Sequence, residues 1–355
     1  MSRFALALVA LILLSVAAMA ERPRPLGWAM DALRNGNWDV AASLAARDGA
    51  VAADVIEWQR LRAGRGSETA VRAFLERRPN WPGEAFLRRK SEPAIGAAGP
   101  DAIIAFYGDE LPQTALGALD YAAAQIAAGN EGDAHATIVL AWRGMPMRAG
   151  TQARFVAQYS DLIAPHHTAR TSALLWTGDR ESARRMLDLI PEGQAHLARA
   201  RIALQSRASN VNALIDKVPA SLQSDGGLAH DRFEWRIRNR QWAGAKDLLF
   251  ETSRSADALG TPEAWANRRR AMVRDEMRDG DPARAYQLAA RHFLSEGSNY
   301  ADLEWLAGYI ALRKLGDPEL ALGHFQNHRN AIASPISRGR AGYWIGRAHE
   351  AAGNA

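Results

Sequence analysis

The stretch Gly316-Asp317-Pro318-Glu319-Leu320-Ala321 is one copy of a short motif that recurs along this chain of 355 residues. Five of its six copies carry alanine five residues after the glycine. The copies consist of glycine followed by Asp or Asn and begin at positions 36, 129, 178, 280, 316 and 353.

Each position of the motif suits a tight turn between two helices. The glycine tolerates the left-handed conformation that ends one helix, and the Asp or Asn can cap the start of the next. Pro282 and Pro318 fall at the first helical position, where a missing N–H costs nothing. The alanine, one turn further on, lets two helices cross closely. The motif therefore predicts helical hairpins, with degenerate copies at Arg65 and Arg240.

The spacing of the copies predicts how the hairpins are arranged. The last three glycines, at positions 280, 316 and 353, lie 36 and 37 residues apart, which is close to the length of helix-pair repeats. We therefore expect an all-α fold in which helical hairpins stack into a superhelical solenoid similar to tetratricopeptide arrays. A compact globular helical bundle is the alternative, since it obeys the same packing rules.

The stretch between Asp302 and Leu315 predicts an amphipathic helix within this array. Its charged residues Glu304, Arg313 and Lys314 are expected away from the apolar face. The residues expected near that face are Leu303, Leu306, Ala307, Ile310 and Leu315.

Composition supports a helical fold and excludes several kinds of chemistry. Alanine accounts for 71 residues, and 40 of the 44 basic residues are arginine, both of which favour helices. The absence of cysteine excludes a disulfide framework, a thiolate nucleophile and a cysteine zinc site. The net charge of +5 is spread over a long chain and does not argue for a nucleic-acid partner.

The first twenty residues have the pattern of a secretory signal. Arg3 precedes an apolar run from Phe4 to Leu14, and Ala18-Met19-Ala20 supplies the small residues of a cleavage site. A membrane anchor is the alternative, although the run is shorter than the roughly 20 residues that span a bilayer. We expect a signal peptide over residues 1–20 and a mature periplasmic chain from residue 21 to 355 with no membrane span.

Three stretches near the end of the sequence resemble the soluble lytic murein transglycosylases. Their order and spacing carry the resemblance, which is architectural over the residues before them. The first includes Glu304-Trp305-Leu306, the second Leu315-Gly316-Asp317-Pro318, and the third Tyr343-Trp344. In full they are residues 300–308, 315–325 and 334–348.

The resemblance implies a periplasmic protein with an N-terminal U-shaped superhelix, a linker domain and a C-terminal lysozyme-like domain. That family cleaves the bond between N-acetylmuramic acid and N-acetylglucosamine in peptidoglycan and leaves a 1,6-anhydro sugar. Its catalytic glutamate belongs to a Glu-Ser motif, and here the only such pair is Glu181-Ser182, among arginines at the expected start of a helix. We therefore expect no catalytic residue and no cofactor in residues 21–355, which would form a U-shaped superhelical domain that runs into the start of a linker domain and is truncated at residue 355.

Three further sets of residues could bind ligands. His324 and His328 lie one helical turn apart, but no third metal ligand accompanies them, so no metal site is predicted. Arginine and aromatic residues alternate from Arg232 to Trp242, a mixture that can bind an anionic polymer. The alternative there is a solvated arginine face, and the same alternative applies to the basic runs at 88–90 and 268–270. The tryptophans that could line a glycan path, or fill gaps between helices, are Trp235, Trp242, Trp305 and Trp344.

These observations lead to two functional hypotheses. The first is the non-catalytic superhelical portion of a lytic murein transglycosylase, whose partners are peptidoglycan glycan strands and other cell-wall proteins. The second is a stand-alone periplasmic adaptor whose concave wall binds a protein partner.

Overall fold

The computed structural model describes residues 25–354, and every regular element in that range is a helix. The predicted all-α class is therefore confirmed. The expected signal peptide lies outside the described residues. The chain divides into two compact units, one up to Ile163 and one from Ala164 onward, and no shift in composition marks the division.

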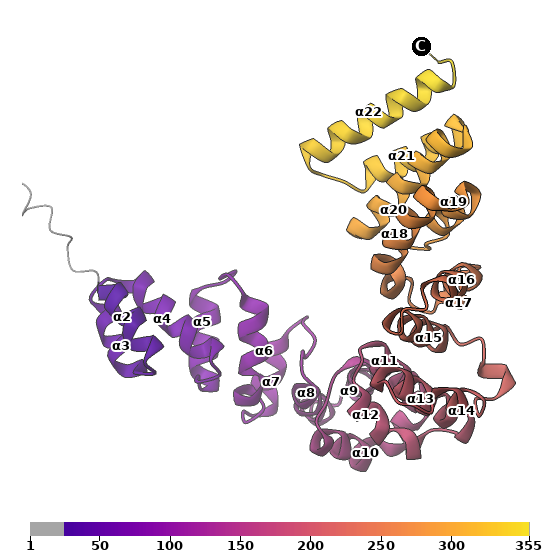
Figure 1. The fold of residues 1–355 in the computed structure, drawn as a ribbon. Helices are drawn as coiled ribbons and strands as arrows, with labels where there is room; N and C mark the ends of the chain where they lie inside the picture. The colour runs from indigo at the N-terminus through magenta and orange to yellow at the C-terminus, as the bar shows by residue number, and fades with distance from the viewer. Residues whose placement is uncertain (1–24, 355) are drawn as a thin grey trace, which may run out of the picture. The chain divides into compact units, whose positions relative to one another are not determined.

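The helices of the first unit pack mainly against their neighbours in chain order. Its apolar core includes one local cluster among residues 29–56 and another among residues 61–124, and further buried apolar residues such as Trp142 and Phe155 lie on α9 and α10. In Figure 1 the unit runs from indigo to magenta. Its helices are α2 (Pro25–Arg34), α3 (Trp38–Ala46), α4 (Ala50–Arg62), α5 (Glu68–Arg77), α6 (Glu84–Ile95), α7 (Pro100–Tyr107), α8 (Ala115–Ala127), α9 (Glu131–Gly144) and α10 (Ala149–Ile163).

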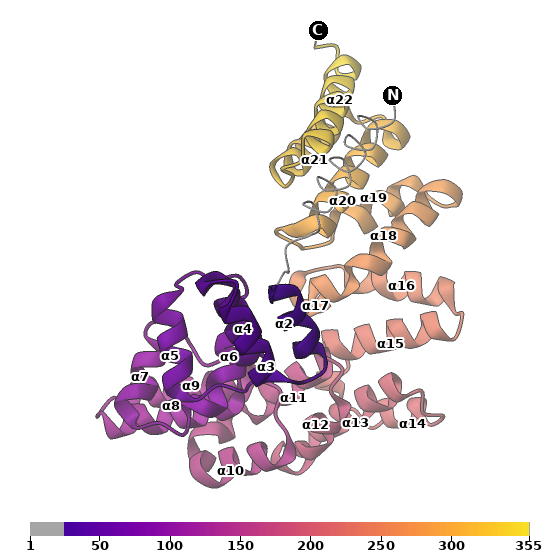
Figure 2. The same ribbon diagram turned by 90° about the vertical axis from the view of Figure 1, so that its left-hand side faces the viewer.

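The second unit repeats this local packing, and the pairs α15–α16, α18–α19 and α20–α21 follow one another in Figure 2. Short 3-10 segments occur at residues 164–166, 187–189 and 220–222. The remaining elements are α11 (His167–Trp176), α12 (Arg180–Arg185), α13 (Glu192–Ser206), α14 (Val211–Ile215), α15 (Gly226–Arg238), α16 (Trp242–Thr252), α17 (Ala256–Leu259), α18 (Pro262–Asp279), α19 (Pro282–Ala290), α20 (Gly297–Ile310), the π-helical turn η4 (Ala311–Leu315), α21 (Pro318–Asn330) and α22 (Pro335–Ala351).

The recurring motif closes helices as predicted at five of its six copies. Residue Gly36 has φ 76°, and its N–H donates to the carbonyl of Leu33 at 3.0 Å while that of Asn37 donates to the carbonyl of Ala32 at 2.9 Å. This pair of bonds is the Schellman ending of a helix. The degenerate copy at Arg240 adopts the same conformation, with φ 61°. The other glycines with positive φ in the motif are Gly129, Gly178, Gly316 and Gly353.

Gly280 departs from the prediction, since its φ is −118°. The lack of a side chain at this position leaves room for Glu276, since a Cβ here would lie 2.6 Å from the carboxyl carbon of that residue. That carboxylate accepts a hydrogen bond from Lys246 Nζ at 2.7 Å. A larger residue at this position would therefore force the Glu276 side chain to move and would disturb its contact with Lys246.

The polar residue after the glycine caps the next helix only when it is aspartate. Asp179, Asp281 and Asp317 each accept a hydrogen bond from a backbone N–H of the following helix, whereas Asn37 and Asn130 make no side-chain cap bond. Pro282 and Pro318 occupy the first turn of α19 and α21, as expected.

The alanines of the motif are the most consistent part of the repeat. Each lies in the first turns of the second helix of a pair, and none has any exposed surface, which is what close crossing of two helices requires. The fully buried set is Ala41, Ala134, Ala183, Ala285 and Ala321, together with Ala245 of the degenerate copy at Arg240. The degenerate copy at Arg65 departs from the pattern, since its Ala70 is only half-buried and Arg65 does not have a positive φ.

The prediction of an amphipathic helix over residues 302–315 is wrong for two residues, Leu315 and Glu304. Leu315 is 38% exposed because η4 inserts a π-helical turn after Ile310, which rotates the following residues away from the apolar face. Glu304 is only 5% exposed, since histidine and asparagine side chains bind its carboxylate in the interior. Leu303, Leu306, Ala307 and Ile310 are buried as predicted.

None of the described helices has the length and apolar character needed to span a membrane.

We expect Ala134→Leu to destabilise the first unit by about 1–3 kcal/mol, because the added atoms would separate α8 from α9. Chemical unfolding followed by circular dichroism measures the effect. Ala136→Leu, two residues later on the exposed side of α9, is the matched control and should change stability by less than about 0.5 kcal/mol. Equal effects of both substitutions would contradict the close-crossing role of Ala134.

Candidate functional site

The Glu-Ser pair occupies the start of α12. The side chain of Glu181 is 88% exposed and lies 3.3 Å from Arg185, while the N–H of Ser182 donates to Asp179 at 3.0 Å. Arg185 also donates to the Ser182 hydroxyl at 2.7 Å. An acid this exposed lacks the enclosed, water-poor surroundings in which a general acid works. The geometry is that of a solvated helix start, as the sequence favoured.

His324 belongs to a buried network that the sequence did not predict. The carboxylate of Glu304 on α20 contacts His292 Nε2 at 2.9 Å and His324 Nδ1 at 2.8 Å, and it accepts a hydrogen bond from Asn327 at 3.0 Å. The far nitrogen of His324 lies 3.0 Å from the hydroxyl of Tyr286. The network connects α20 with α21 and with the loop after α19.

The hydrogen bonds of this network fix its chemistry. His292 Nδ1 accepts the backbone N–H of Leu294 at 2.9 Å, so its Nε2 carries the hydrogen that is donated to Glu304. Burial raises the pKa of Glu304, but hydrogen bonds from His292, His324 and Asn327 outweigh it and lower the pKa to about 2. The carboxylate is thus held ionised and acts as a structural acceptor.

The two histidines considered for a metal do not converge. His328 turns its Nδ1 to the carbonyl of Ala301 at 2.7 Å, on a different partner from that of His324. Within residues 25–354 no group of three or more His, Asp and Glu side chains has the arrangement of a metal site.

The basic run at 268–270 is not a solvated arginine face. Arg269 is fully buried and donates to the carbonyl of Leu288 and the hydroxyl of Ser253, and burial lowers its pKa to about 10. Arg270 pairs with Asp302 at 2.6 Å. These arginines connect helices of the second unit and leave little charge for a polymer.

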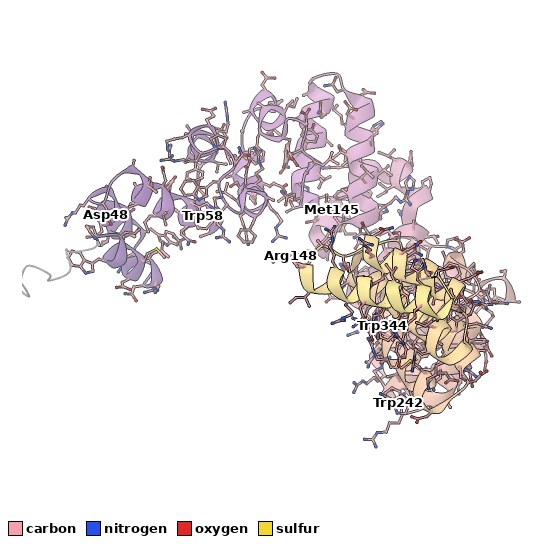
Figure 3. All side chains as sticks on the ribbon, turned by 90° about the horizontal axis from the view of Figure 1, so that it is seen from above. Asp48, Trp58, Met145, Arg148, Trp242 and Trp344 are labelled. Atoms are coloured by element: carbon pink, nitrogen blue, oxygen red, sulfur yellow. The ribbon has the colours of Figure 1, made fainter. Side chains whose placement is uncertain are left out.

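Two of the four candidate tryptophans fill space between helices. Trp305 and Trp344 pack edge to face at 6.0 Å, and Trp344 also stacks on Phe325 at 5.8 Å. Trp242, labelled in Figure 3, stands at the start of α16 with 54% of its surface exposed. Trp235 on α15 is half-buried, as are Trp305 and Trp344, so Trp242 is the most exposed of the four.

The stretch from Arg232 to Trp242 has several different roles in the structure. Phe233 is fully buried in the core. Arg236 donates to the carbonyl of Gly244 at 2.6 Å and Arg238 to that of Leu204 at 2.7 Å, so both hold neighbouring helices together. Arg232 makes no ion pair within the part of the chain that the structure describes.

A groove of about 340 Å³ lies between α14 and α15 beside Trp235. Its floor is apolar, and its walls carry amide, carboxylate and guanidinium groups. We call it the α14–α15 groove. It is lined by Leu204, Val211, Asn212, Ile215, Asp216, Arg232, Trp235, Arg236 and Gln241.

The polar walls of the α14–α15 groove are free to bind a ligand. In residues 25–354 the side chains of Asn212, Asp216, Arg232 and Gln241 form no hydrogen bond with the protein. Planar polar groups beside an indole can hydrogen-bond hydroxyls while the ring contacts an apolar face, and a concave site with a few convergent polar groups is the usual form of a ligand site. Two arginines and one aspartate line the groove. Burial and the Arg236 cation lower the pKa of Arg232, and the carboxylate of Glu251 opposes this shift.

The sequence pointed to one wall of this groove and missed the other. Arg232, Trp235 and Arg236 fall in the predicted stretch, whereas Asn212 on α14 and Asp216 directly after it were not singled out. Their spacing of four residues places them on one helical face, but only the packing of α14 against α13 and the groove volume show which face it is.

No protein-family model matches the chain, and neither the curated proteins nor the solved structures contain a significant match. The function is therefore argued from the residues themselves.

We expect Glu304→Gln to lower the free energy of unfolding by roughly 3 kcal/mol at pH 7, because the buried network loses its ionised acceptor. The folded pKa is depressed, so the contribution is complete above the ordinary carboxyl value of 4.5 and is lost as the pH falls toward about 2. Unfolding curves at several pH values should converge for the two proteins in acid.

Glu319→Gln is the control, since this exposed carboxylate on α21 belongs to no network. Its curve should follow that of the unsubstituted protein at every pH. A difference between Glu304→Gln and the unsubstituted protein that is constant from pH 7 to pH 3 would contradict the assignment.

Proposed function

We propose that this chain is a non-catalytic helical-repeat portion of a periplasmic lytic murein transglycosylase and that it binds peptidoglycan glycan strands. The observation that carries the proposal is the α14–α15 groove, where Trp235 lies beside Arg232 and unpaired amide and carboxylate groups. The resemblance of residues 300–348 to that family supports the choice of ligand.

The proposal includes a superhelical arrangement of the hairpins similar to that of tetratricopeptide arrays. Two features support it. Helical pairs in both units are closed by the same turn and cross at a buried alanine, and each apolar cluster draws on a limited stretch of chain. Local cores shared between successive pairs are typical of arrays in which each repeat contacts only its neighbours.

The chemistry of the α14–α15 groove suits a charged glycan. The indole of Trp235 offers a flat apolar surface for the C–H face of a sugar ring. Asn212 and Gln241 can donate to and accept from hydroxyls, and Arg232 can pair with a carboxylate. Peptidoglycan presents sugar rings and peptide carboxylates together, so one strand could satisfy the groove.

Co-sedimentation of the purified protein with insoluble murein sacculi tests this function. We expect the double variant Asn212→Ala/Arg232→Gln to bind about tenfold more weakly, because it loses two polar contacts of about 1 kcal/mol each or less. Both positions lie outside the buried core, so the thermal unfolding midpoint should stay within a few degrees of its original value.

Trp28→Ala is the control, since this exposed tryptophan lies on α2 and outside the groove. It should leave sacculus binding unchanged. Equal loss in both variants would argue against the groove. Absence of any binding by the unsubstituted protein would instead favour the alternative, a periplasmic adaptor with a protein partner.

The same preparation should release no soluble anhydro-muropeptides from sacculi, because Glu181 is solvated at a helix start and Glu304 is held ionised by its network. Chromatography of the supernatant measures this release. Anhydro-sugar release that disappears on changing one carboxylate would show a catalytic residue within this chain.

A further inference from the structure

Three cations surround one aromatic ring in the first unit. The guanidinium of Arg62, at the end of α4, lies 4.9 Å from the centre of the Phe86 ring on α6. The guanidinium of Arg89 lies 5.4 Å and the ammonium of Lys90 5.6 Å from the same centre. No two of these cations can therefore be more than about 11 Å apart, which is close to the screening length of physiological salt.

The acidic residues of α4 and α6 are all engaged elsewhere. Asp54 pairs with Arg77 and Arg78 at 2.9 and 2.6 Å. Glu57 binds Arg60, and Glu84 binds Arg88, at 2.9 and 2.8 Å. The buried carboxylate of Glu92 accepts hydrogen bonds from Thr114 and from the backbone N–H of Gln113. No carboxylate of these two helices is left to neutralise the three cations.

The three cations differ in this respect from most of the arginines near them in the sequence. Over residues 54–88, Arg60, Arg72, Arg77, Arg78 and Arg88 each form an ion pair with Asp or Glu, and Arg65 is the exception, with its guanidinium over Trp38. Among residues 25–354, Arg62, Arg89 and Lys90 form none. Contact with an aromatic face stabilises each cation by about 0.5–1 kcal/mol at an exposed site, but it removes none of their mutual repulsion.

The cluster is accessible to a ligand. Arg89 and Lys90 are exposed, and Arg62 is half-buried against Phe86 and against Trp58, whose ring centre lies 4.4 Å away. With cations gathered around Phe86, little of its ring remains to stack on a sugar. The cluster is thus suited to charge and differs in kind from the α14–α15 groove.

We propose that Arg62, Arg89 and Lys90 form a binding site for a multiply charged phosphate group. A single carboxylate would leave two of the three cations unneutralised, whereas a phosphomonoester carries up to two negative charges and a diphosphate carries more. Guanidinium groups bind phosphate oxygens in a bidentate manner, and lysine adds a point charge. The site is independent of the glycan function proposed above.

Isothermal titration of the full chain with inorganic diphosphate tests the site. We expect saturable binding that weakens as salt is added, and about tenfold weaker binding by Arg89→Gln/Lys90→Gln. Diphosphate should raise the thermal unfolding midpoint of the unsubstituted protein. The unfolding midpoint of the double variant alone should stay close to that of the unsubstituted protein, because the loss of two cation–π contacts and the relief of repulsion between like charges oppose each other.

The matched control is Arg143→Gln/Arg148→Gln, which removes two exposed arginines from the same unit and gives the same change in net charge. It should bind diphosphate as the unsubstituted protein does. Equal weakening in both double variants, or no binding at all, would overturn the proposal. So would a variant that loses stability but keeps its affinity, since the cations would then serve only to join α4 to α6.

Vesicles distinguish the source of the phosphate. Binding to phosphatidylglycerol vesicles but not to phosphatidylcholine vesicles, with competition by diphosphate, would assign the site to lipid headgroups. Binding of diphosphate without vesicle binding would assign it to a soluble phosphate compound. Equal affinity for acetate and diphosphate would overturn the choice of phosphate. Sacculus binding should survive Arg89→Gln/Lys90→Gln, so failure of this site leaves the glycan function separately testable.

Discussion

The close crossing of consecutive helices is the constraint on which the rest of the structure depends. Each pair can approach only if the first helix ends abruptly and the second presents no side chain larger than a methyl group at the crossing. The left-handed residue at positions such as Gly129 satisfies the first condition, and the fully buried Ala134 satisfies the second. Large apolar residues then fill the space on either side, and the local core clusters follow.

This constraint explains why the sequence predicted the hairpins well. Turn residues act on the backbone within a few positions, so their effect can be read without knowledge of the fold. Even Arg240, which lacks the favoured glycine, takes the left-handed conformation because the surrounding helices fix the turn. Gly280 shows the limit of local reasoning, since the reason for glycine there is the carboxylate of Glu276 and not the conformation of the turn.

Interactions between helices that are distant in the sequence could not be predicted from local sequence patterns. Glu304 was placed on the solvent face because an acid in an amphipathic pattern is normally hydrated. Its partners His292, His324 and Asn327 come from two other segments, and nothing in the local pattern reveals that they meet. The π-helical turn at Ala311–Leu315 shifted the apolar face in the same unforeseeable way. The wall of the α14–α15 groove on α14 was likewise not predictable from the sequence. The wall with Trp235 could be found, because it lies in a stretch where arginine and aromatic residues alternate.

An arginine-rich sequence is ambiguous because arginine serves as a structural connector as often as it serves as a binding group. Arg236, Arg238 and Arg269 all donate to backbone carbonyls of neighbouring helices, so their charge carries no information about ligands. Only the arginines that remain after every structural bond has been assigned are informative. Arg232 is such a residue in the second unit and Arg62 in the first. One lies beside an indole with free amides, and the other lies in a set of cations that no carboxylate of their helices neutralises. The difference between the two surroundings is the reason for proposing sugar as the ligand of the groove and phosphate as the ligand of the cation cluster.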